Sequence, residues 1–117
     1  MNANTVYTVA FGDDGFLMIY NPRRKGWEMP GGHIEPGEQI SEAAKREFVE
    51  ESGHTVEVVD MTEAHGCFVC AGRLGPKVAD GEMDGRVFTE LPEELAFDRD
   101  EYEGVMEWAY SVMGRYQ

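Results

Sequence analysis

The sequence predicts an α/β fold in which helices cover both sides of a mixed β-sheet. Short runs with the alternation and the β-branched or aromatic residues of strands recur along the chain, and two longer segments have the periodicity of helices. Helical segments that separate groups of strands are typical of a sheet packed between helices. At 117 residues, the chain has the length of one domain, so we expect residues 1–117 to share a single core.

The N-terminal third is predicted to consist of short strands joined by tight turns. Four runs have strand character: residues 5–11, 16–20, 27–29 and 33–34. Gly12-Asp13-Asp14-Gly15 separates the first two and is a hairpin signal. Pro30-Gly31-Gly32 separates the last two and lets the backbone turn sharply or approach a ligand.

The first helix is predicted at about residues 39–52. The segment is rich in helix-forming residues, and Gly53 can supply the left-handed residue that ends many helices. One face of this helix is apolar and can pack on the sheet: Ile40, Ala43, Ala44 and Phe48. A second face carries three carboxylates at positions i, i+3 and i+4: Glu47, Glu50 and Glu51.

The C-terminal half adds three more predicted strands and a last helix. The strands are expected at residues 55–63, 67–73 and 86–89, with a loop at residues 74–85 that contains Gly75-Pro76. Asp98 or Asp100 can cap the last helix, which is expected to continue to about Gly114. Its apolar stripe is Tyr102, Val105, Met106, Ala109 and Met113.

The three glutamates on the first helix are candidates for a metal site. They lie in its C-terminal half, where the helix dipole disfavours negative charge. Two full charges ~5.5 Å apart repel by roughly 3 kcal/mol at an effective dielectric of about 20, and this should raise the pKa of some of them. A hard divalent cation would remove that repulsion, and oxygen ligands suit Mg²⁺ or Mn²⁺. The alternative is a solvated helix face, on which such pairs cost only a few tenths of a kcal/mol.

A longer pattern surrounds these glutamates and favours the metal site. It consists of Gly32, five residues, Glu38, seven residues, and then Arg46-Glu47-Phe48-Val49-Glu50-Glu51-Ser52-Gly53. The pattern resembles the signature of the Nudix hydrolases, G-x5-E-x7-R-E-U-x-E-E-x-G-U, in which U is a bulky apolar residue. Every fixed position matches except the last, where His54 replaces the apolar residue. Just before it, Trp27-Glu28-Met29-Pro30-Gly31-Gly32 resembles the W-x-x-P-G-G approach common in that family.

The resemblance implies a Nudix-type α/β/α sandwich with a mixed sheet and a loop-helix-loop catalytic motif. It also implies a Mg²⁺-dependent pyrophosphohydrolase, with Mn²⁺ as the alternative metal, that cleaves a nucleoside diphosphate linked to another group. Residues 69–72 lack the Pro or Tyr that marks some ADP-ribose and dinucleoside-polyphosphate branches, which favours MutT-like action on (deoxy)nucleoside triphosphates, including oxidised ones. The alternatives are a dinucleoside polyphosphate, a nucleotide sugar or an RNA 5′ end as substrate, or a non-catalytic nucleotide-binding sensor.

The same resemblance assigns roles to individual residues. The catalytic residues it implies are Arg46, Glu47, Glu50, Glu51 and Glu82. The metal site it implies comprises Gly32, Glu47, Glu50, Glu51 and Glu82. Glu82 stands where many members carry a further acidic residue; Asp84 is the nearest rival, and a plain loop residue is the alternative. Arg46, at i+4 from Glu42 and i−4 from Glu50, is expected to hold a metal-binding carboxylate by a forked pair, unless it forms only an ordinary surface ion pair.

Substrate contacts are expected mainly in the segment that precedes the helix. The candidates are Arg23, Arg24, Trp27, Gly31, Gly32 and Glu38. Arg23-Arg24-Lys25 is a basic cluster that can bind phosphate, although Asn21-Pro22 just before it also indicates a solvated turn. Four aromatic residues could stack on a base but are more often core residues in short strands: Phe11, Tyr20, Trp27 and Phe88.

Charge and cysteine content limit the partners. The net charge of −13 disfavours duplex nucleic acid and anionic membranes as partners, although a nucleotide that arrives with a metal ion is compatible with it. No apolar run approaches ~18 residues and no signal peptide is recognisable, so we expect a soluble, cytoplasmic protein, monomeric or homodimeric. Cys67 and Cys70 form a lone CxxC and are interpreted as reduced, buried strand residues, with redox or zinc chemistry as the alternative.

Overall fold

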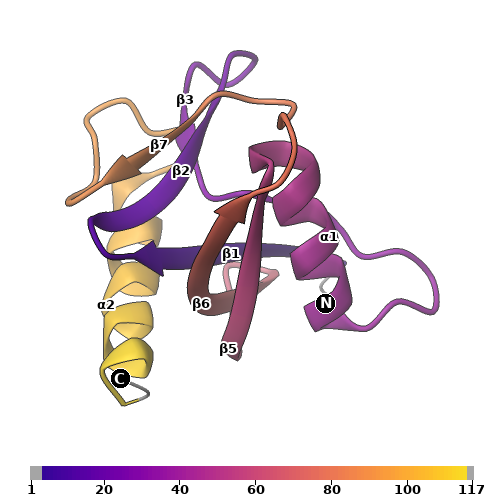
Figure 1. The fold of residues 1–117 in the computed structure, drawn as a ribbon. Helices are drawn as coiled ribbons and strands as arrows, with labels where there is room; N and C mark the ends of the chain where they lie inside the picture. The colour runs from indigo at the N-terminus through magenta and orange to yellow at the C-terminus, as the bar shows by residue number, and fades with distance from the viewer. Residues whose placement is uncertain (1–3, 116–117) are drawn as a thin grey trace.

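The computed structural model describes residues 4–115 and contains seven strands and two helices (Figure 1). The strands are β1 (Thr5–Gly12), β2 (Gly15–Asn21), β3 (Gly26–Glu28), β4 (Gly31–His33), β5 (His54–Ala64), β6 (Cys67–Lys77) and β7 (Gly85–Phe88). The helices are α1 (Ile40–Ser52) and α2 (Arg99–Arg115). Each predicted element is present, and most of their bounds lie within two residues of the prediction.

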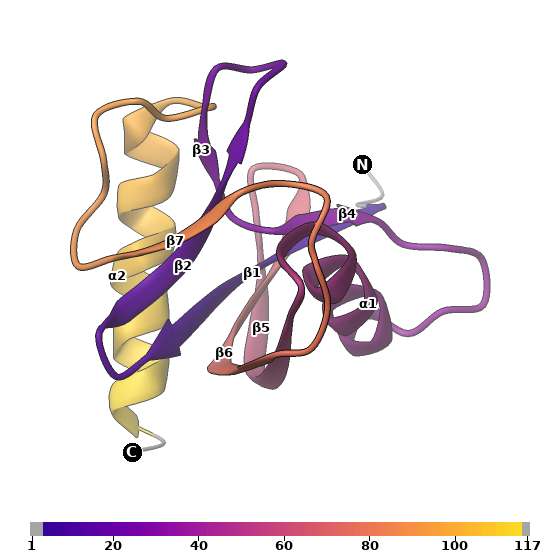
Figure 2. The same cartoon turned by 45° about the horizontal axis from the view of Figure 1, so that its top comes forward.

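All seven strands join one mixed sheet. The main path has the order β3-β2-β1-β6-β5, while β4 pairs with β1 and β7 pairs with β2. β1 and β6 are parallel over Val6↔Phe68 to Phe11↔Arg73, and the other strand pairs are antiparallel. The parallel pair therefore joins the N-terminal strands to the long β5–β6 hairpin, which lies between the two helices in the view of Figure 2.

The two helices cover opposite faces of this sheet, as the predicted sandwich requires (Figure 1). Alternate residues of β1 show this directly, since Val9 packs in the cluster that includes α2, and Val6 and Ala10 pack in the clusters that include α1. On the α1 side, the predicted apolar stripe is buried at Ala43, Ala44 and Phe48 and half-buried at Ile40. On the α2 side, the whole predicted stripe is buried: Tyr102, Val105, Met106, Ala109 and Met113.

The predicted loop at residues 74–85 is wrong in its first part, because β6 continues to Lys77. Residues 74–77 remain paired with β5, through Val56↔Leu74 and His54↔Lys77. Pro76 is tolerated there because a bulge interrupts the register between His54 and Val56, and the pairing with β1 already ends at Arg73. Neither helix in residues 4–115 is both long enough and apolar enough to cross a membrane.

Gly53 ends α1 and connects the signature helix to the loop after β6. Its backbone is left-handed, with φ of 80°, and its N–H donates to the Val49 carbonyl at 2.8 Å. Its own carbonyl accepts hydrogen bonds from the Val78 and Ala79 N–H groups at 2.8 and 3.2 Å. A Cβ at this position would collide with the backbone carbonyl of Ala79, so glycine is required for two separate reasons.

Gly37 provides a matched control for a test of this contact. Its φ is also 80°, but a Cβ there would meet no atom within 4 Å. We expect Gly37→Ala to lower the free energy of unfolding by about 1–2 kcal/mol, the cost of the left-handed backbone alone. Gly53→Ala should cost clearly more, because the loop after β6 must also move. Urea unfolding of both variants checks this, and equal losses would contradict the proposed contact.

Candidate active site

Arg46 links the loop before α1 to the acidic face of that helix. Its Nε and Nη2 donate to the two carboxylate oxygens of Glu38 at 2.7 and 2.9 Å, which is a forked pair. Its Nη1 donates to Glu47 at 2.8 Å and to Glu50 at 3.3 and 3.4 Å, and its Nη2 also reaches the His33 carbonyl at 2.9 Å. The guanidinium lowers the pKa of Glu38 to about 2, so this carboxylate stays ionised at neutral pH.

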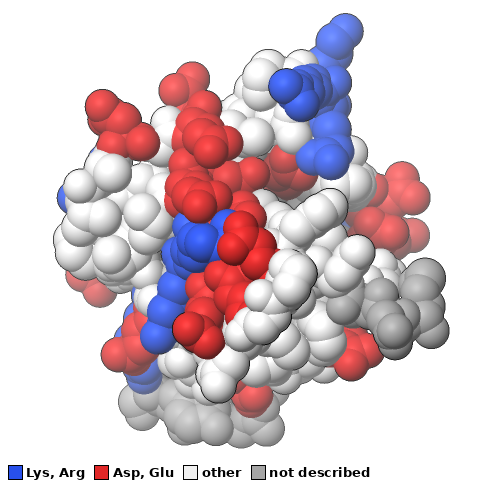
Figure 3. Space-filling view, turned by 90° about the vertical axis from the view of Figure 1, so that its right-hand side faces the viewer, with Lys and Arg blue, Asp and Glu red and all other residues white. Residues whose placement is uncertain are grey.

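The forked partner of Arg46 therefore lies in the loop before α1, whereas we expected a carboxylate of the helix itself. Glu42, which the i−4 spacing offered as a partner, instead accepts a hydrogen bond from the Gln39 backbone N–H at 3.2 Å and caps the helix. Glu38 takes its place because the loop before α1 brings this side chain back against Arg46. On the α1 side of the molecule, the space-filling view shows a small basic area surrounded by acidic side chains (Figure 3).

Glu51 is the acidic residue of the signature that faces inward. Its Oε1 accepts a hydrogen bond from the Gly31 N–H at 2.8 Å, which joins the end of α1 to β4. The pKa of Glu51 is raised to about 7, mainly by burial, with repulsion from Glu28, Glu47 and Glu82 in addition. The expectation that some of the three glutamates have raised pKa values is thus met at Glu51, although burial rather than crowding is the leading cause.

Gly32 is shaped to receive the carboxylate of Glu47. A Cβ at position 32 would lie on the carboxylate atoms of Glu47, so any other residue would displace this side chain. Gly31 is equally restricted, because a Cβ there would collide with the backbone of β1 at Val6 and Tyr7. The two glycines therefore permit the close approach of β4 to both α1 and β1.

The acidic groups around Glu51 fit a hard divalent cation in their chemistry. They offer carboxylate oxygens in a partly buried place where their charges repel one another, and such donors suit Mg²⁺ or Mn²⁺. Within residues 4–115, however, no three His, Cys, Asp or Glu side chains are arranged as a metal-binding group. Glu47 and Glu50 are directed to Arg46, and Glu51 is directed to Gly31. The three carboxylates therefore do not converge on one point.

Glu82 lies near this acidic group, on the segment between β6 and β7. Its backbone N–H donates to the Glu50 carbonyl at 3.0 Å, and its charge helps to raise the pKa of Glu51. The side chain is exposed. Its rival Asp84 is placed elsewhere, since the Asp84 carbonyl accepts the Tyr20 N–H at 2.9 Å and continues the β2–β7 pairing.

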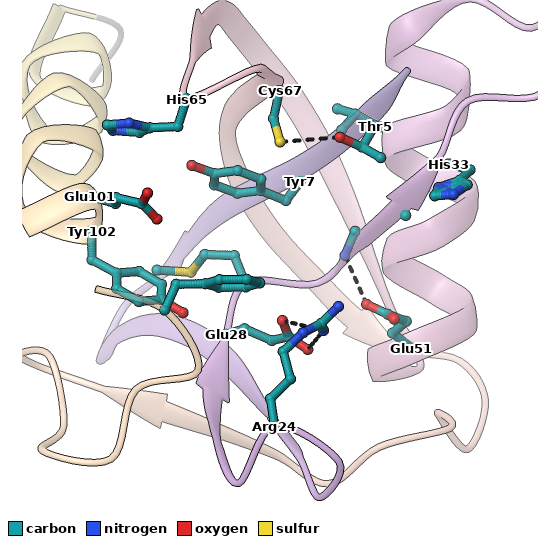
Figure 4. Close-up of a pocket in the computed structure, with 15 residues that line it drawn as sticks. Thr5, Tyr7, Arg24, Glu28, His33, Glu51, His65, Cys67, Glu101 and Tyr102 are labelled. Atoms are coloured by element: carbon teal, nitrogen blue, oxygen red, sulfur yellow. Dashed lines mark hydrogen bonds and ion pairs between the residues drawn. The ribbon is translucent and has the colours of Figure 1, made fainter. Parts of the chain in front are cut away.

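A cleft of about 500 Å³ opens beside Glu51, between β1, β4 and α2 (Figure 4). Four of the predicted site residues line it: Arg24, Gly31, Gly32 and Glu51. The other predicted site residues are outside its lining: Arg23, Trp27, Glu38, Arg46, Glu47, Glu50 and Glu82. The lining also includes residues that we did not predict as site residues, among them Tyr7, Glu28, Phe97, Glu101 and Tyr102.

The arginines of the predicted basic cluster lie in different places, one in the cleft and one in the solvent. Arg24 lines the cleft, where its Nη1 lies 3.1 Å from each carboxylate oxygen of Glu28 and its guanidinium stacks 5.0 Å from the centre of the Phe97 ring. Glu28 is buried and also accepts a hydrogen bond from Asn21 Nδ2 at 2.6 Å. Arg23 is exposed on the turn, and its backbone N–H donates to Asn21 Oδ1 at 3.0 Å.

The four aromatic residues considered for base stacking are all outside this cleft. The Trp27 ring packs edge-on against Tyr20 and Phe88, at 5.4 and 4.8 Å between ring centres, and Arg86 lies over it. Phe11 packs against Phe16 at 6.2 Å and Tyr110 at 5.0 Å. The core interpretation agrees with the packing of Phe11, Trp27 and Phe88, which are half-buried against the core, whereas Tyr20 packs edge-on against Trp27 outside the core clusters.

The cysteines are free thiols on β6, as expected. Cys70 is fully buried, and burial raises its pKa to about 11, so the thiol stays protonated. Cys67 is only half-buried, contrary to the expectation; it lines the cleft and accepts a hydrogen bond from Thr5 Oγ1 at 3.1 Å.

The family model of the NUDIX domain matches residues 1–113 of this chain. The chain therefore belongs to the Nudix family. A segment is 44% identical over 41 residues to an uncharacterized Nudix hydrolase, YvcI, of Bacillus subtilis (strain 168), covering 35% of this chain and 26% of that protein. Another comparison gives 48% identity over 42 residues with an RNA pyrophosphohydrolase of Dinoroseobacter shibae, covering 36% of this chain and 26% of the relative. These matches span about a quarter of the length of each relative.

Solved structures of the family have the same fold. A NUDIX hydrolase from Nitrosomonas europaea superposes with a TM-score of 0.73 at 20% identity, over 97% of this chain and 74% of the other. A UDP-X diphosphatase superposes with a TM-score of 0.73 at 19% identity, over 100% of this chain and 65% of the other. At these identities the likeness shows the fold and does not identify a substrate.

The raised pKa of Glu51 leads to a prediction about stability in the absence of metal. Because the folded state holds this proton more tightly than the unfolded state, stability should fall as the pH rises from about 4.5 to about 7. Glu51→Gln keeps an oxygen for the Gly31 N–H and removes the charge. In a chelating buffer, this variant should be more stable than the wild type by about 1–3 kcal/mol above pH 7, and the difference should vanish below about pH 4.5.

Urea unfolding between pH 4 and 8 measures this difference. Glu63→Gln, which removes one charge from an exposed position on β5, is the matched control and should follow the wild-type profile. A constant difference between Glu51→Gln and the wild type across this pH range would show that the buried charge is not its cause.

Proposed function

We propose that this chain is a Mg²⁺-dependent pyrophosphohydrolase, also active with Mn²⁺, that acts on a nucleoside diphosphate linked to another group. Its preferred substrates are (deoxy)nucleoside triphosphates, including oxidised ones. The observation that carries the proposal is the inward-facing Glu51, whose pKa is raised to about 7 at the edge of a cleft large enough for a small ligand. The Nudix signature around it, which departs from the family pattern only at His54, supports catalysis over simple nucleotide sensing.

In this proposal the acidic residues at the end of α1 hold the metal. The ligands are drawn from Glu47, Glu50 and Glu51, with the Gly32 backbone and Glu82 beside them. When bound, the cation supplies positive charge that neutralises phosphate oxygens and assists attack by water. Arg46 positions Glu47 and Glu50, while the loop that contains Glu38 and His33 keeps Arg46 in place.

The reaction is hydrolysis of a phosphoric anhydride. Water attacks phosphorus, the bridging P–O bond breaks, and a nucleoside monophosphate leaves together with pyrophosphate or the remaining group. One of the carboxylates near Glu51 accepts the proton from water. The net charge of −13 favours a free nucleotide over an RNA 5′ end, because a long polyanion would be repelled over much of the surface.

A panel of nucleoside triphosphates, dinucleoside polyphosphates, nucleotide sugars and 5′-triphosphorylated RNA tests this proposal, with Mg²⁺, Mn²⁺ or chelator present. Anion-exchange chromatography would identify the products. We expect triphosphates to yield a monophosphate and pyrophosphate with either metal, and no product with chelator. Faster hydrolysis of one of the other classes would reassign the substrate, and failure to hydrolyse any of them would overturn the proposed activity.

The acidic residues can be tested individually. Glu50→Gln and Glu51→Gln should each lower kcat by about 10²-fold or more at saturating Mg²⁺, because a neutral amide is a much weaker ligand for a hard cation. Glu63→Gln is the charge-matched control and should retain wild-type turnover. Pyrophosphate release measures the rates, and circular dichroism verifies the fold. Turnover near that of the wild type in both variants would exclude these residues as metal ligands.

Arg24 and Arg23 form a matched pair for the role of the basic turn. Because Arg24 lines the cleft and Arg23 does not, Arg24→Ala should raise KM by about 10-fold, and this effect should shrink as salt is added. Arg23→Ala removes the same charge from the same turn and should leave KM within about twofold of the wild type. An unchanged KM for Arg24→Ala at low salt would exclude a phosphate contact at this residue.

A further inference from the structure

The cleft has two chemically different ends. Glu51 and the glycines of β4 lie at one end, where the signature helix meets the sheet (Figure 4). Tyr7, His65 and Glu101 lie together toward the other end, beside α2, and Figure 4 shows the Tyr7 ring directed away from Glu51 and toward this group. An elongated ligand with its phosphates beside Glu51 would therefore place its other end against Tyr7 and Glu101.

The Tyr7 hydroxyl and the Glu101 carboxylate at this end are available to a ligand. Within residues 4–115, neither the Tyr7 hydroxyl nor the Glu101 carboxylate has a hydrogen-bond or ion-pair partner, although the two groups are close enough for the carboxylate charge to affect the phenol. Burial raises the pKa of Tyr7, and the nearby Cys67 and Glu101 add to this, so the phenol keeps its proton and can donate it. The neighbouring Tyr102 hydroxyl is already engaged, since it donates to the Trp27 carbonyl at 2.9 Å.

These groups present one donor and two acceptors to a ligand. A carboxylate offers two acceptor oxygens side by side, while the phenol offers a donor. Guanine carries the complementary edge, in which O6 accepts a hydrogen bond and N1–H and the N2 amino group donate. Adenine presents one donor beside an acceptor nitrogen, and uracil presents one donor between two acceptors, so each would leave a group of the cleft unpaired.

We propose that this end of the cleft recognises the guanine base of the substrate, with Glu101 accepting from N1–H and the N2 amino group and Tyr7 donating to O6. Both residues are specificity-determining contacts and have no part in hydrolysis. The proposal rests on the proposed function only in placing the phosphates at Glu51. Guanine oxidised at C8 keeps the same edge and is accepted equally by these two residues.

Aromatic side chains supply the remaining surface that a base requires. Phe97 and Tyr102 lie close together in the lining, 6.5 Å between ring centres, and Phe97 is 48% exposed. The Arg24 guanidinium stacks against the same Phe97 ring. Stacking on such a surface favours every base, whereas the edge contacts of Glu101 distinguish among them. The two contributions can therefore be separated by mutation.

Comparison of GTP with inosine triphosphate isolates the contact at the N2 amino group, because inosine differs from guanosine only in lacking it. The wild type should show a kcat/KM for GTP roughly 10–100-fold above that for inosine triphosphate or ATP, as expected for a hydrogen bond to a charged group. Glu101→Gln should reduce the preference for GTP over inosine triphosphate to within about threefold. Glu103→Gln, an exposed position on the same helix, should keep the wild-type preference.

Two further variants distinguish base reading from general damage to the cleft. Tyr7→Phe keeps the ring and removes the donor, so it should lower kcat/KM for GTP and inosine triphosphate equally, because both carry O6, and leave ATP nearly unchanged. Phe97→Ala should lower kcat/KM for all three nucleotides by a similar factor. Equal wild-type kcat/KM for GTP and inosine triphosphate, or a preference that persists in Glu101→Gln, would overturn the proposal.

Calorimetric titration with GMP, IMP and AMP in chelator gives a readout that does not depend on hydrolysis. Tighter binding of GMP than of IMP in the wild type, lost in Glu101→Gln, supports guanine recognition even if no nucleotide is hydrolysed, in which case the proposed activity alone fails. Hydrolysis without any guanine preference leaves the activity standing and overturns the base assignment. Absence of both hydrolysis and GMP binding overturns both.

Discussion

The Arg46 guanidinium is the interaction on which the geometry of the acidic site depends. A single planar cation joins a carboxylate from the loop, two carboxylates from the helix and the backbone carbonyl of His33. Without it, the acidic residues of α1 would repel one another, and the polar side chains of the loop would lose their link to the acidic face of the helix. Lysine could not replace it, because only the forked guanidinium can satisfy these partners simultaneously.

Glycine has an equally specific role on the other side of the site. The carboxylate of Glu47 occupies the space in which position 32 would otherwise carry a side chain, and the Gly31 N–H is directed to Glu51. β4 is thereby held between α1 and β1 at a separation that only bare backbone allows. The charged residues of the signature and its glycines thus form one packing arrangement. In it the Arg46 guanidinium, the carboxylates and the backbone of β4 hold one another in position.

The sequence predicted the elements, the two apolar stripes and the acidic helix face, because each of these follows from local periodicity and from residues close in the chain. It also led to the family, through the signature. It did not predict Glu38 as the forked partner of Arg46, because Glu38 precedes α1 and helix periodicity does not describe the direction of a side chain in the loop before the helix. Tyr7, Glu28 and Glu101 were missed for a similar reason: they meet in one cleft only after α2 packs beside β1, and no short-range pattern records that contact.

The first residues of β1 line the cleft, and the strand contributes side chains to both faces of the sheet. Tyr7 lies in the cleft and pairs in register with Gly31, while its neighbour Val6 is buried against the α1 side. Because successive residues of a strand face opposite ways, an insertion or deletion of one residue in β1 would exchange these two environments along the rest of the strand. The residues of β1 that line the cleft and those that pack in the core therefore depend on the same strand register. In descendants of this chain, the lining of the cleft can diversify readily on α2 and on the loop before it, where a side chain can change without reversing a strand, whereas β1 can vary by substitution but not in length.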